Sequence, residues 1–249
     1  MAQILPAMRS LVCFLLFIMA TISSWCQPIN QKLTITPLQG DLYVFTSYGS
    51  FNGEPVPANG MYLITKEGAV LFDAPWDTTQ FKPLLDSIAS KHHKKVIMSL
   101  ATHWHDDRSG GLAFYRNHGA KTYTTKLTDE ICQEQHKNRA TFTFDSDTVF
   151  SVGEYTFEAY YPGEGHTKDN IVIWFGKDRV LYGGCFVKST TATNLGNLEE
   201  ANIKAWPESI RKVQQKFGVP AHIITGHDSW ESTESLNHTL MLLKEQSAG

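Results

Sequence analysis

The chain has 249 residues, of which 42% are hydrophobic and 12% aromatic, so it is long enough to bury one large core. Its formal net charge is only −3, and acidic and basic residues are interspersed. This charge gives no electrostatic reason to expect a nucleic-acid partner.

Residues 1–26 have the pattern of a cleaved secretory signal peptide. Arg9 gives a positive start, an apolar stretch runs from Leu11 to Ile22, and small residues follow it. This stretch is shorter than the roughly 20 residues that a membrane-spanning helix needs. We therefore expect export to the periplasm without a membrane partner, and a single mature domain, residues 27–249, that is a monomer.

The mature chain opens with short strands rich in β-branched and aromatic residues, predicted at Leu33 to Thr36, Leu42 to Phe45, Met61 to Thr65 and Ala69 to Phe72. The segment from Ser47 to Gly60 is rich in Gly, Pro, Ser and Asn, with Phe51 at its centre. This composition predicts a mobile hairpin loop between two of the strands.

Helices and strands then alternate along the chain. Apolar residues at helical spacing predict helices over Gln80 to Ser90, Gly111 to Asn117, Thr128 to Glu134, Ile203 to Phe217 and Glu231 to Lys244. Further strands are predicted at Lys95 to Ala101, Tyr155 to Tyr161, Ile171 to Phe175, Val180 to Tyr182 and Ala221 to Ile224. The second half repeats the order of the first, which predicts two similar sheets packed together with helices on both outer faces.

A cluster of candidate metal ligands follows the strand at residues 95–101, where the chain reads His103-Trp104-His105-Asp106-Asp107. Two histidines two residues apart point to nearly opposite sides of a helix, so this spacing favours a strand end or a loop. Alternation along an extended segment would place Asp107 on the side of the histidines and one step further along. A His-x-His pair alone is weak evidence for a metal site.

Three more candidate ligands lie where other predicted strands end. His166 stands in a glycine-flanked turn, Cys185 follows Gly183-Gly184, and His227 follows Gly226. Ligands gathered at several strand ends are a common way to build one site from distant sequence. Imidazole and thiolate with one carboxylate suit zinc better than calcium or magnesium.

The cysteines leave one alternative open. The predicted leader contains Cys13 and Cys26, so the mature chain keeps Cys132 and Cys185. These two thiols could pair in an oxidising compartment. A zinc-bound thiolate at Cys185 would be protected from pairing, and we favour this second interpretation.

Taken together, these motifs resemble those of metallo-β-lactamases over essentially the whole mature chain. The resemblance rests on His103-x-His105-x-Asp107, Gly165-His166-Thr167-x-Asp169-Asn170, Gly183-Gly184-Cys185, Leu195-Gly196-Asn197 and Gly226-His227. It implies an α/β fold of the αββα sandwich type, with two mixed sheets packed face to face. It also implies two zinc ions, one held by His103, His105 and His166, and the other by Asp107, Cys185 and His227.

The resemblance further implies a reaction. Hydroxide generated at zinc would attack the lactam carbonyl of penicillins, cephalosporins and carbapenems, Asp107 would orient it, and the second zinc would stabilise the leaving nitrogen. Such a hydrolase confers antibiotic resistance. Lys188 is similar to the residue that binds the substrate carboxylate, and Asn197 to one that donates to the substrate carbonyl; a surface lysine and a simple turn asparagine are the alternatives.

Four neighbouring residues have predicted roles around the site. Phe51 would cover the substrate from the loop, and Trp76 is either a wall of the site or plain core. Asp73 and Asp106 are candidates to orient the histidine ligands. The remaining histidines of the mature chain lie on polar or helical stretches and are predicted at the surface.

The same scaffold carries other activities, so function must rest on the site. A thioesterase of the glyoxalase-II type and a periplasmic zinc-buffering protein are the alternatives. Relatives of the first type have a histidine directly after the motif aspartate and a bridging aspartate in the place of Cys185, whereas this chain has Arg108 and Cys185. A structural zinc is normally closed by four protein ligands, so six ligands for two ions favour an enzyme.

Overall fold

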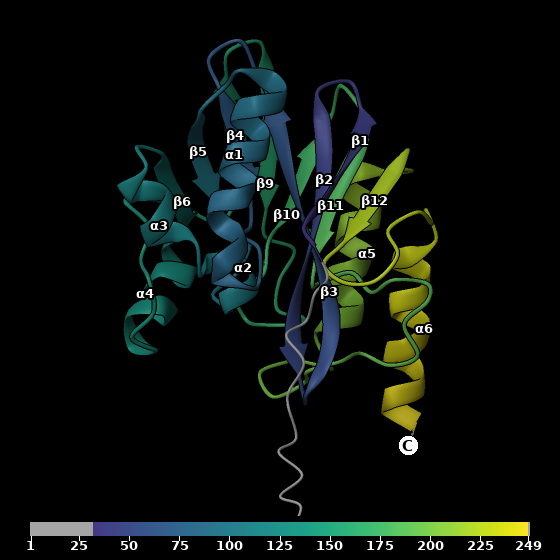
Figure 1. Cartoon of the computed structure of the whole chain (residues 1–249). Coiled ribbons are helices and arrows are strands. Elements are labelled where there is room, and N and C mark those ends of the chain that lie inside the picture. Colours follow the sequence, from purple (N-terminus) through teal and green to yellow (C-terminus); the bar gives the residue numbers. More distant parts are fainter. Residues whose placement is uncertain (1–31, 249) are drawn as a thin grey trace, which may run out of the picture. The chain divides into compact units, whose positions relative to one another are not determined.

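Two β-sheets face each other in the computed structural model of the chain, which describes residues 32–248 (Figure 1). The predicted signal peptide, residues 1–26, lies outside the described residues. The first sheet has seven strands in sequence order: β1 (Thr34–Gln39), β2 (Leu42–Phe51), β3 (Glu54–Ile64), β4 (Ala69–Phe72), β5 (Val96–Leu100), β6 (Lys121–Thr125) and β7 (Phe142–Phe144). Strands β1 to β4 pair antiparallel, and β4 to β7 pair parallel.

The second sheet has five strands in the order β12-β11-β10-β9-β8. Their bounds are β8 (Thr148–Val152), β9 (Tyr155–Tyr160), β10 (Val172–Phe175), β11 (Val180–Gly184) and β12 (His222–Thr225). Only the β11 and β12 pair is parallel within this sheet. Both sheets are therefore mixed.

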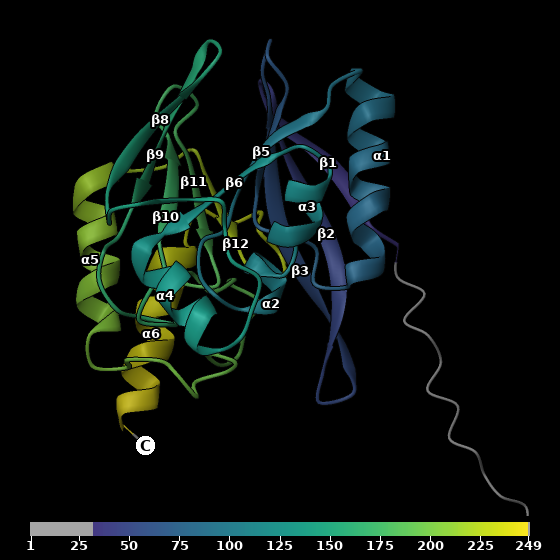
Figure 2. The ribbon, with the colours of Figure 1, turned by 90° about the vertical axis from the view of Figure 1, so that its left-hand side faces the viewer.

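Helices cover the outer face of each sheet. Helix α1 (Phe81–His92) and α3 (Leu112–Asn117) pack on the first sheet, and α4 (Lys126–Glu134) contacts β6 and β7, while α5 (Trp206–Phe217) and α6 (Ser235–Ala248) cover the second sheet (Figure 2). A 3-10 turn (Thr78–Gln80) leads into α1, and α2 (Asp106–Ser109) is one short turn after β5. No helix of the described part is long and apolar enough to cross a membrane.

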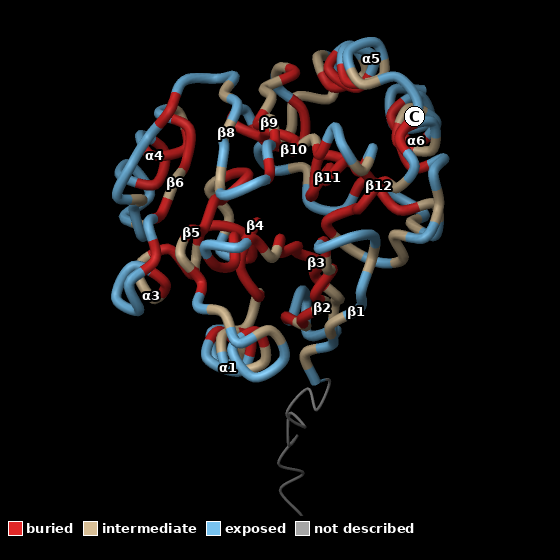
Figure 3. The backbone as a smooth tube through the Cα atoms, turned by 90° about the horizontal axis from the view of Figure 1, so that it is seen from above, coloured by how far each residue is buried: buried red, intermediate tan, exposed pale blue. Residues whose placement is uncertain are grey.

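The main core lies between the two sheets, where buried residues line the inner faces (Figure 3). At its centre Phe72 of β4 meets Phe157 of β9 and Phe175 of β10 edge to face, with ring centroids 4.9 and 5.1 Å apart. Two smaller apolar layers fill the space between each sheet and its helices. The αββα sandwich predicted from the sequence is thus confirmed.

The segment from Ser47 to Gly60 differs from its prediction, because it is a β-hairpin and not a loop. Strands β2 and β3 stay paired as far as Phe51 and Glu54. The turn between them is Asn52-Gly53, whose φ angles of 53° and 85° suit a tight hairpin turn. Its composition suggested a loop, but ladder hydrogen bonds stabilise the strands despite their low intrinsic preference.

Strands β6, β7 and β8, the 3-10 turn and the short helix α2 were not predicted. Strand β7 has only three residues and β6 is rich in threonine, so neither carries a strong apolar alternation. The other elements lie where the sequence predicts them, with ends that differ by a few residues.

Candidate metal centre

Three histidine side chains converge from two loops. His103 and His105 lie between β5 and α2, and His166 lies between β9 and β10. His103 Nε2 is 3.1 Å from His105 Nδ1, and the ring centroids of both lie 5.1 Å from that of His166. His103 and His166 are buried and His105 is half-buried. The three histidine rings therefore lie side by side.

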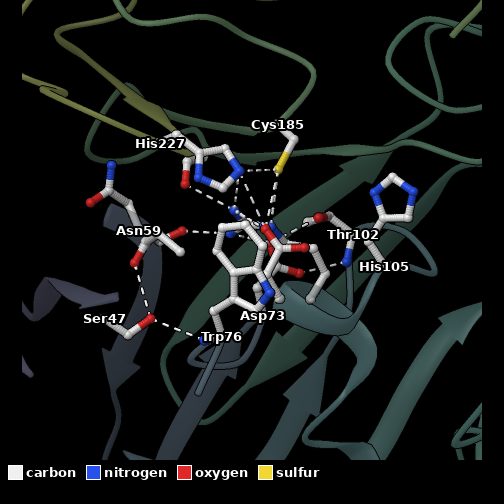
Figure 4. Close-up of polar contacts among 12 residues, drawn as sticks. Ser47, Asn59, Asp73, Trp76, Thr102, His105, Cys185 and His227 are labelled. Atoms are coloured by element: carbon white, nitrogen blue, oxygen red, sulfur yellow. Dashed lines mark hydrogen bonds and ion pairs between the residues drawn. The ribbon is translucent and has the colours of Figure 1, made fainter. Parts of the chain in front are cut away.

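Asp107, Cys185 and His227 form a second cluster. Figure 4 shows the side chains of Cys185 and His227 next to each other. Cys185 Sγ lies 3.6 Å from Asp107 Oδ2 and 3.2 Å from His227 Nε2. Asp107 Oδ2 and His227 Nε2 are 3.3 Å apart. Gly226 allows this approach, because a Cβ there would lie 2.5 Å from the backbone nitrogen of Cys185. Cys132 and Cys185 are both free thiols, so the disulfide alternative is wrong.

The separations between these donor atoms fit zinc. Zn–N, Zn–O and Zn–S bonds of about 2.0 to 2.3 Å in a tetrahedron put neighbouring donors about 3.3 to 3.6 Å apart. The 3.1 Å spacing between His103 and His105 and the three spacings of the second cluster lie close to this range. Donor atoms also lie within 4.8 Å of one another in the mixed sets His103-His105-Asp107 and His103-His166-Cys185, so the two clusters adjoin.

Hydrogen bonds fix which histidine nitrogens are free to bind a metal. His227 Nδ1 donates to the backbone oxygen of Pro57 at 2.9 Å, which leaves Nε2 facing Cys185. His103 Nδ1 lies 3.4 Å from the Thr102 hydroxyl, which itself donates to Asp73 Oδ2 at 2.8 Å. Asp73 therefore contacts His103 only indirectly, through the hydroxyl of Thr102, and not as a direct partner of the histidine.

Arg108 is buried under the second cluster and connects its members. Its guanidinium lies 2.9 Å from Asp107 Oδ2 and donates to Cys185 Sγ at 3.2 Å. It also donates to the backbone oxygens of Asn59 and Gly226 at 2.6 and 2.8 Å. The sequence showed Arg108 as a departure from related families but did not show this contact set, which depends on residues far apart in the chain.

Neighbouring charges shift the pKa values of the candidate ligands. Burial alone would raise the pKa of Asp107, but Arg108 and His227 hold it well below its usual range. Burial opposes a charge on His227, yet Cys185 and Asp107 raise its pKa to about 9. Burial lowers the pKa values of His103 and His166 well below the usual range, so these imidazoles are neutral and can act as ligands.

A cavity of about 840 Å³ opens over both clusters. Phe51 and Trp76 line one part of it, and Lys188 and Asn197 line another. The Trp76 ring lies 5.7 Å from that of His227 and is half-buried, so it is a wall of the site and not core. Lys188 is buried, with Nζ 5.4 Å from the Trp206 ring, so the alternative of a surface lysine is wrong.

Asn197 lies exposed on the rim of the cavity. Its side-chain oxygen accepts a hydrogen bond from the backbone nitrogen of Glu199 at 3.1 Å. The amide Nδ2 is therefore the group left to donate toward a ligand.

Two predictions about the first motif need correction. Asp106 does not orient a histidine, because its carboxylate is exposed and paired with Lys137 at 2.7 Å. Asp107 reaches the site from the first turn of α2, whereas alternation along an extended segment was expected. The chain turns into a helix directly after His105, and this turn swings Asp107 inward.

Glu200 is a further polar neighbour of the site that the sequence did not reveal. Its Oε2 lies 2.6 Å from His105 Nε2. The two residues are 95 positions apart and no motif joins them.

The family model, two curated relatives and one solved structure that match this chain all carry the name metallo-beta-lactamase. Residues 53–237 match the model of the metallo-beta-lactamase superfamily. The chain is 46% identical over 216 residues to metallo-beta-lactamase type 2 of Elizabethkingia meningoseptica, covering 87% of each chain. It is 42% identical over 210 residues to metallo-beta-lactamase IND-1 of Chryseobacterium indologenes, covering 84% of this chain and 88% of the relative. The crystal structure of metallo-beta-lactamase IND-7 superposes with a TM-score of 0.83 at 42% identity, covering 86% of this chain and 99% of that one.

Proposed function

Because the chain belongs to the metallo-beta-lactamase superfamily, we propose that it is a zinc-dependent hydrolase that opens the ring of β-lactam antibiotics and so confers resistance. The observation that carries this function is the clustering of six donor side chains, five of which line a cavity of about 840 Å³. A cavity of this size holds a drug-sized ligand.

We further propose that two zinc ions bind. His103, His105 and His166 would hold one ion, and Asp107, Cys185 and His227 the other. Bound zinc supplies an activated water at neutral pH and positive charge where the leaving nitrogen becomes negative. The fit of the donor spacings to zinc supports this assignment.

The chain's own residues would bind and orient the substrate. Lys188 would pair with the carboxylate that β-lactams carry beside the ring, and Asn197 would donate from Nδ2 to the substrate carbonyl oxygen. Asp107 is contacted by Arg108 and His227 at Oδ2. Its Oδ1 is therefore free to accept a hydrogen bond from the attacking water and later to receive and pass on its proton.

Phe51 at the tip of the β2–β3 hairpin and Trp76 would exclude water from the apolar part of the substrate. Such a site recognises the carboxylate and the amide that all β-lactams share. It therefore discriminates little between the different rings fused to the lactam. We therefore propose activity on penicillins, cephalosporins and carbapenems alike.

Cellular location and assembly are also proposals. The pattern of residues 1–26, outside the described residues, supports export to the periplasm through a cleaved signal peptide. Residues 27–249 would then act as one domain and as a monomer.

The deciding experiment measures hydrolysis of a chromogenic cephalosporin and a carbapenem by the purified mature protein. We expect turnover that a chelator abolishes and zinc restores. Zinc binding without turnover of either lactam, or cleavage of a thioester instead, would contradict the proposed function.

A second experiment tests the number of ions. Cys185→Ser keeps the size of the side chain but replaces a thiolate by a weak hydroxyl ligand. We expect the fold to persist, bound zinc to fall from two ions toward one and turnover to drop sharply. A Cys132→Ser variant, altered at the other buried thiol, should keep both ions. Full activity of Cys185→Ser would exclude the assignment of two zinc ions.

A further inference from the structure

Glu200 contacts a candidate zinc ligand from a loop that is distant in sequence. It lies in the segment 196–201, between β11 and α5, and its Oε2 is 2.6 Å from His105 Nε2. The side chains of His105 and Glu200 are 19% and 37% exposed, so this contact is at the edge of the cavity and partly shielded from water. Partial shielding makes a hydrogen bond to a carboxylate stronger than one in open solvent.

The contact determines the tautomer of His105. A carboxylate only accepts hydrogen bonds, so the proton of the neutral imidazole is on Nε2 and the lone pair is on Nδ1. Nδ1 is the atom that faces His103 Nε2 at 3.1 Å. Glu200 therefore presents His105 to the metal with the nitrogen that the geometry requires.

The same contact also holds the segment that lines the substrate cavity. Among the described residues, the other hydrogen bonds of segment 196–201 stay within residues 194–201: Gly196 N to Asn194, Glu199 N to Asn197, and Ala201 N to Leu198. Within segment 196–201, Glu200 is thus the hydrogen-bonded connection to the metal centre, while the next residue, Asn202, donates from its backbone nitrogen to the oxygen of Gly165 at 2.8 Å. Gly196 lies beside Lys188, because a Cβ built on Gly196 would be 3.9 Å from Lys188 Nζ.

We propose that Glu200 is a positioning residue with two effects: it fixes and strengthens His105 as a zinc ligand, and it holds Asn197 beside Lys188 at the substrate end of the cavity. The inference rests on the proposed zinc-dependent function. It predicts that metal affinity and substrate affinity change together when Glu200 is altered, although Glu200 reaches neither the metal nor the reacting atoms.

The expected magnitudes follow from the hydrogen bond. Losing a partner of a ligand histidine typically costs about 10- to 100-fold in metal affinity. Glu200→Ala removes the acceptor, whereas Glu200→Gln keeps a neutral acceptor of the same length. We therefore expect zinc affinity to fall in the order wild type, Glu200→Gln, Glu200→Ala, with KM rising in the same order.

The experiment measures zinc affinity by competition with a chromophoric chelator, together with KM and kcat at saturating zinc. Glu199→Ala is the matched control, because the Glu199 side chain is exposed on the same segment. The melting temperature of each protein without metal shows whether the variants fold equally well. The visible spectrum of the cobalt-substituted protein reports the ligand geometry and is independent of turnover.

The expected result is weaker zinc binding, an altered cobalt spectrum and a raised KM for Glu200→Ala, with unchanged values for Glu199→Ala. Partial recovery in Glu200→Gln would support the hydrogen bond as the cause. Wild-type zinc affinity and KM in Glu200→Ala would overturn the inference, as would equal losses in Glu199→Ala. A wild-type protein that binds zinc but turns over no lactam would instead contradict the proposed function, and the zinc affinities would still test Glu200.

Discussion

Arg108 shows how one buried residue can balance the charge of a whole site. Its guanidinium is fully enclosed, and burial alone would lower its pKa, yet Asp107 and Cys185 raise it well above its usual range. Asp73 is also within 3.4 Å. The cation therefore offsets the two carboxylates, which would otherwise repel each other in a region of low dielectric constant.

Removing this cation should destabilise the fold. For Arg108→Ala we expect a loss of about 3 to 5 kcal/mol in the free energy of unfolding, because breaking a buried ion pair leaves its partners uncompensated. Chemical denaturation measures this loss. Arg211→Ala is the control, since Arg211 is exposed and pairs loosely with Glu208 on α5. Similar stabilities of the two variants would show that Arg108 has no such role.

The ammonium of Lys188 should impose a pH limit on substrate binding. Burial lowers the pKa of Lys188, so it loses its proton at a lower pH than an exposed lysine. Because only the protonated form pairs with a carboxylate, KM should rise as pH increases through that lowered pKa, by up to about tenfold per pH unit beyond it.

The measurement is KM against pH for a carboxylate-bearing cephalosporin. Lys188→Arg keeps its charge throughout this range and should remove the alkaline rise, whereas Lys188→Ala should have a high KM at every pH. If wild type and Lys188→Arg show the same alkaline profile, the rise comes from another group.

Among the elements, the β2–β3 hairpin is shaped by a close contact between Gly49 and Trp76. A Cβ on Gly49 would lie 2.2 Å from Trp76 Cδ2. Trp76 is also held by its backbone nitrogen, which donates to the Ser47 hydroxyl at 3.1 Å. The glycine thus lets the hairpin lie directly against one wall of the cavity.

Gly49→Ala should move this wall. A rigid indole must shift to admit the methyl group, and overpacking of this kind costs about 1 to 3 kcal/mol. We expect reduced stability in thermal denaturation and a raised KM, with zinc affinity unchanged. Ser50→Ala, at the next and exposed position of β2, is the control. A Gly49→Ala protein with wild-type stability and KM would contradict this view of the hairpin.

The sequence predicted those elements correctly whose pattern lies within a few neighbouring residues. The strand before His103 and the glycine turns at His166, Cys185 and His227 are short patterns, and each candidate ligand lies near the predicted strand end. The hairpin was missed because pairing between β2 and β3, and not composition, makes those residues strands. Asp107 was expected to point inward because of alternation along an extended segment. It points inward instead because helix α2 begins directly after His105.

At the scale of the whole molecule, the candidate metal centre joins the two sheets. His103 and Asp107 follow β5 of the first sheet, whereas Cys185 and His227 follow β11 and β12 of the second. Near the centre, Asn59 of β3 donates from its backbone to Gly226 at 2.8 Å and from its side chain to Thr225 at 3.0 Å. Bound zinc would add a further connection between the sheets.

Zinc should therefore stabilise the entire fold. A ligand that binds only the folded state at 100 times its Kd adds about 2.7 kcal/mol. For a chain of this size this raises the Tm by roughly 5 to 11 °C. Thermal denaturation with chelator and with excess zinc checks the shift, and magnesium should cause none because five of the six proposed donors are nitrogen or sulfur. Equal melting temperatures with zinc and with chelator would show that no such connection forms.

By itself the sequence determined the candidate donor atoms, the layered αββα architecture and the resemblance to one family, because each rests on patterns within a few residues of one another. Only the tertiary structure decided which donors adjoin, that Arg108 compensates their charge, and that Glu200 reaches His105. Those contacts join residues up to 120 positions apart. They exist because two sheets and their loops pack in one particular way, and no local pattern encodes the distance between two such segments.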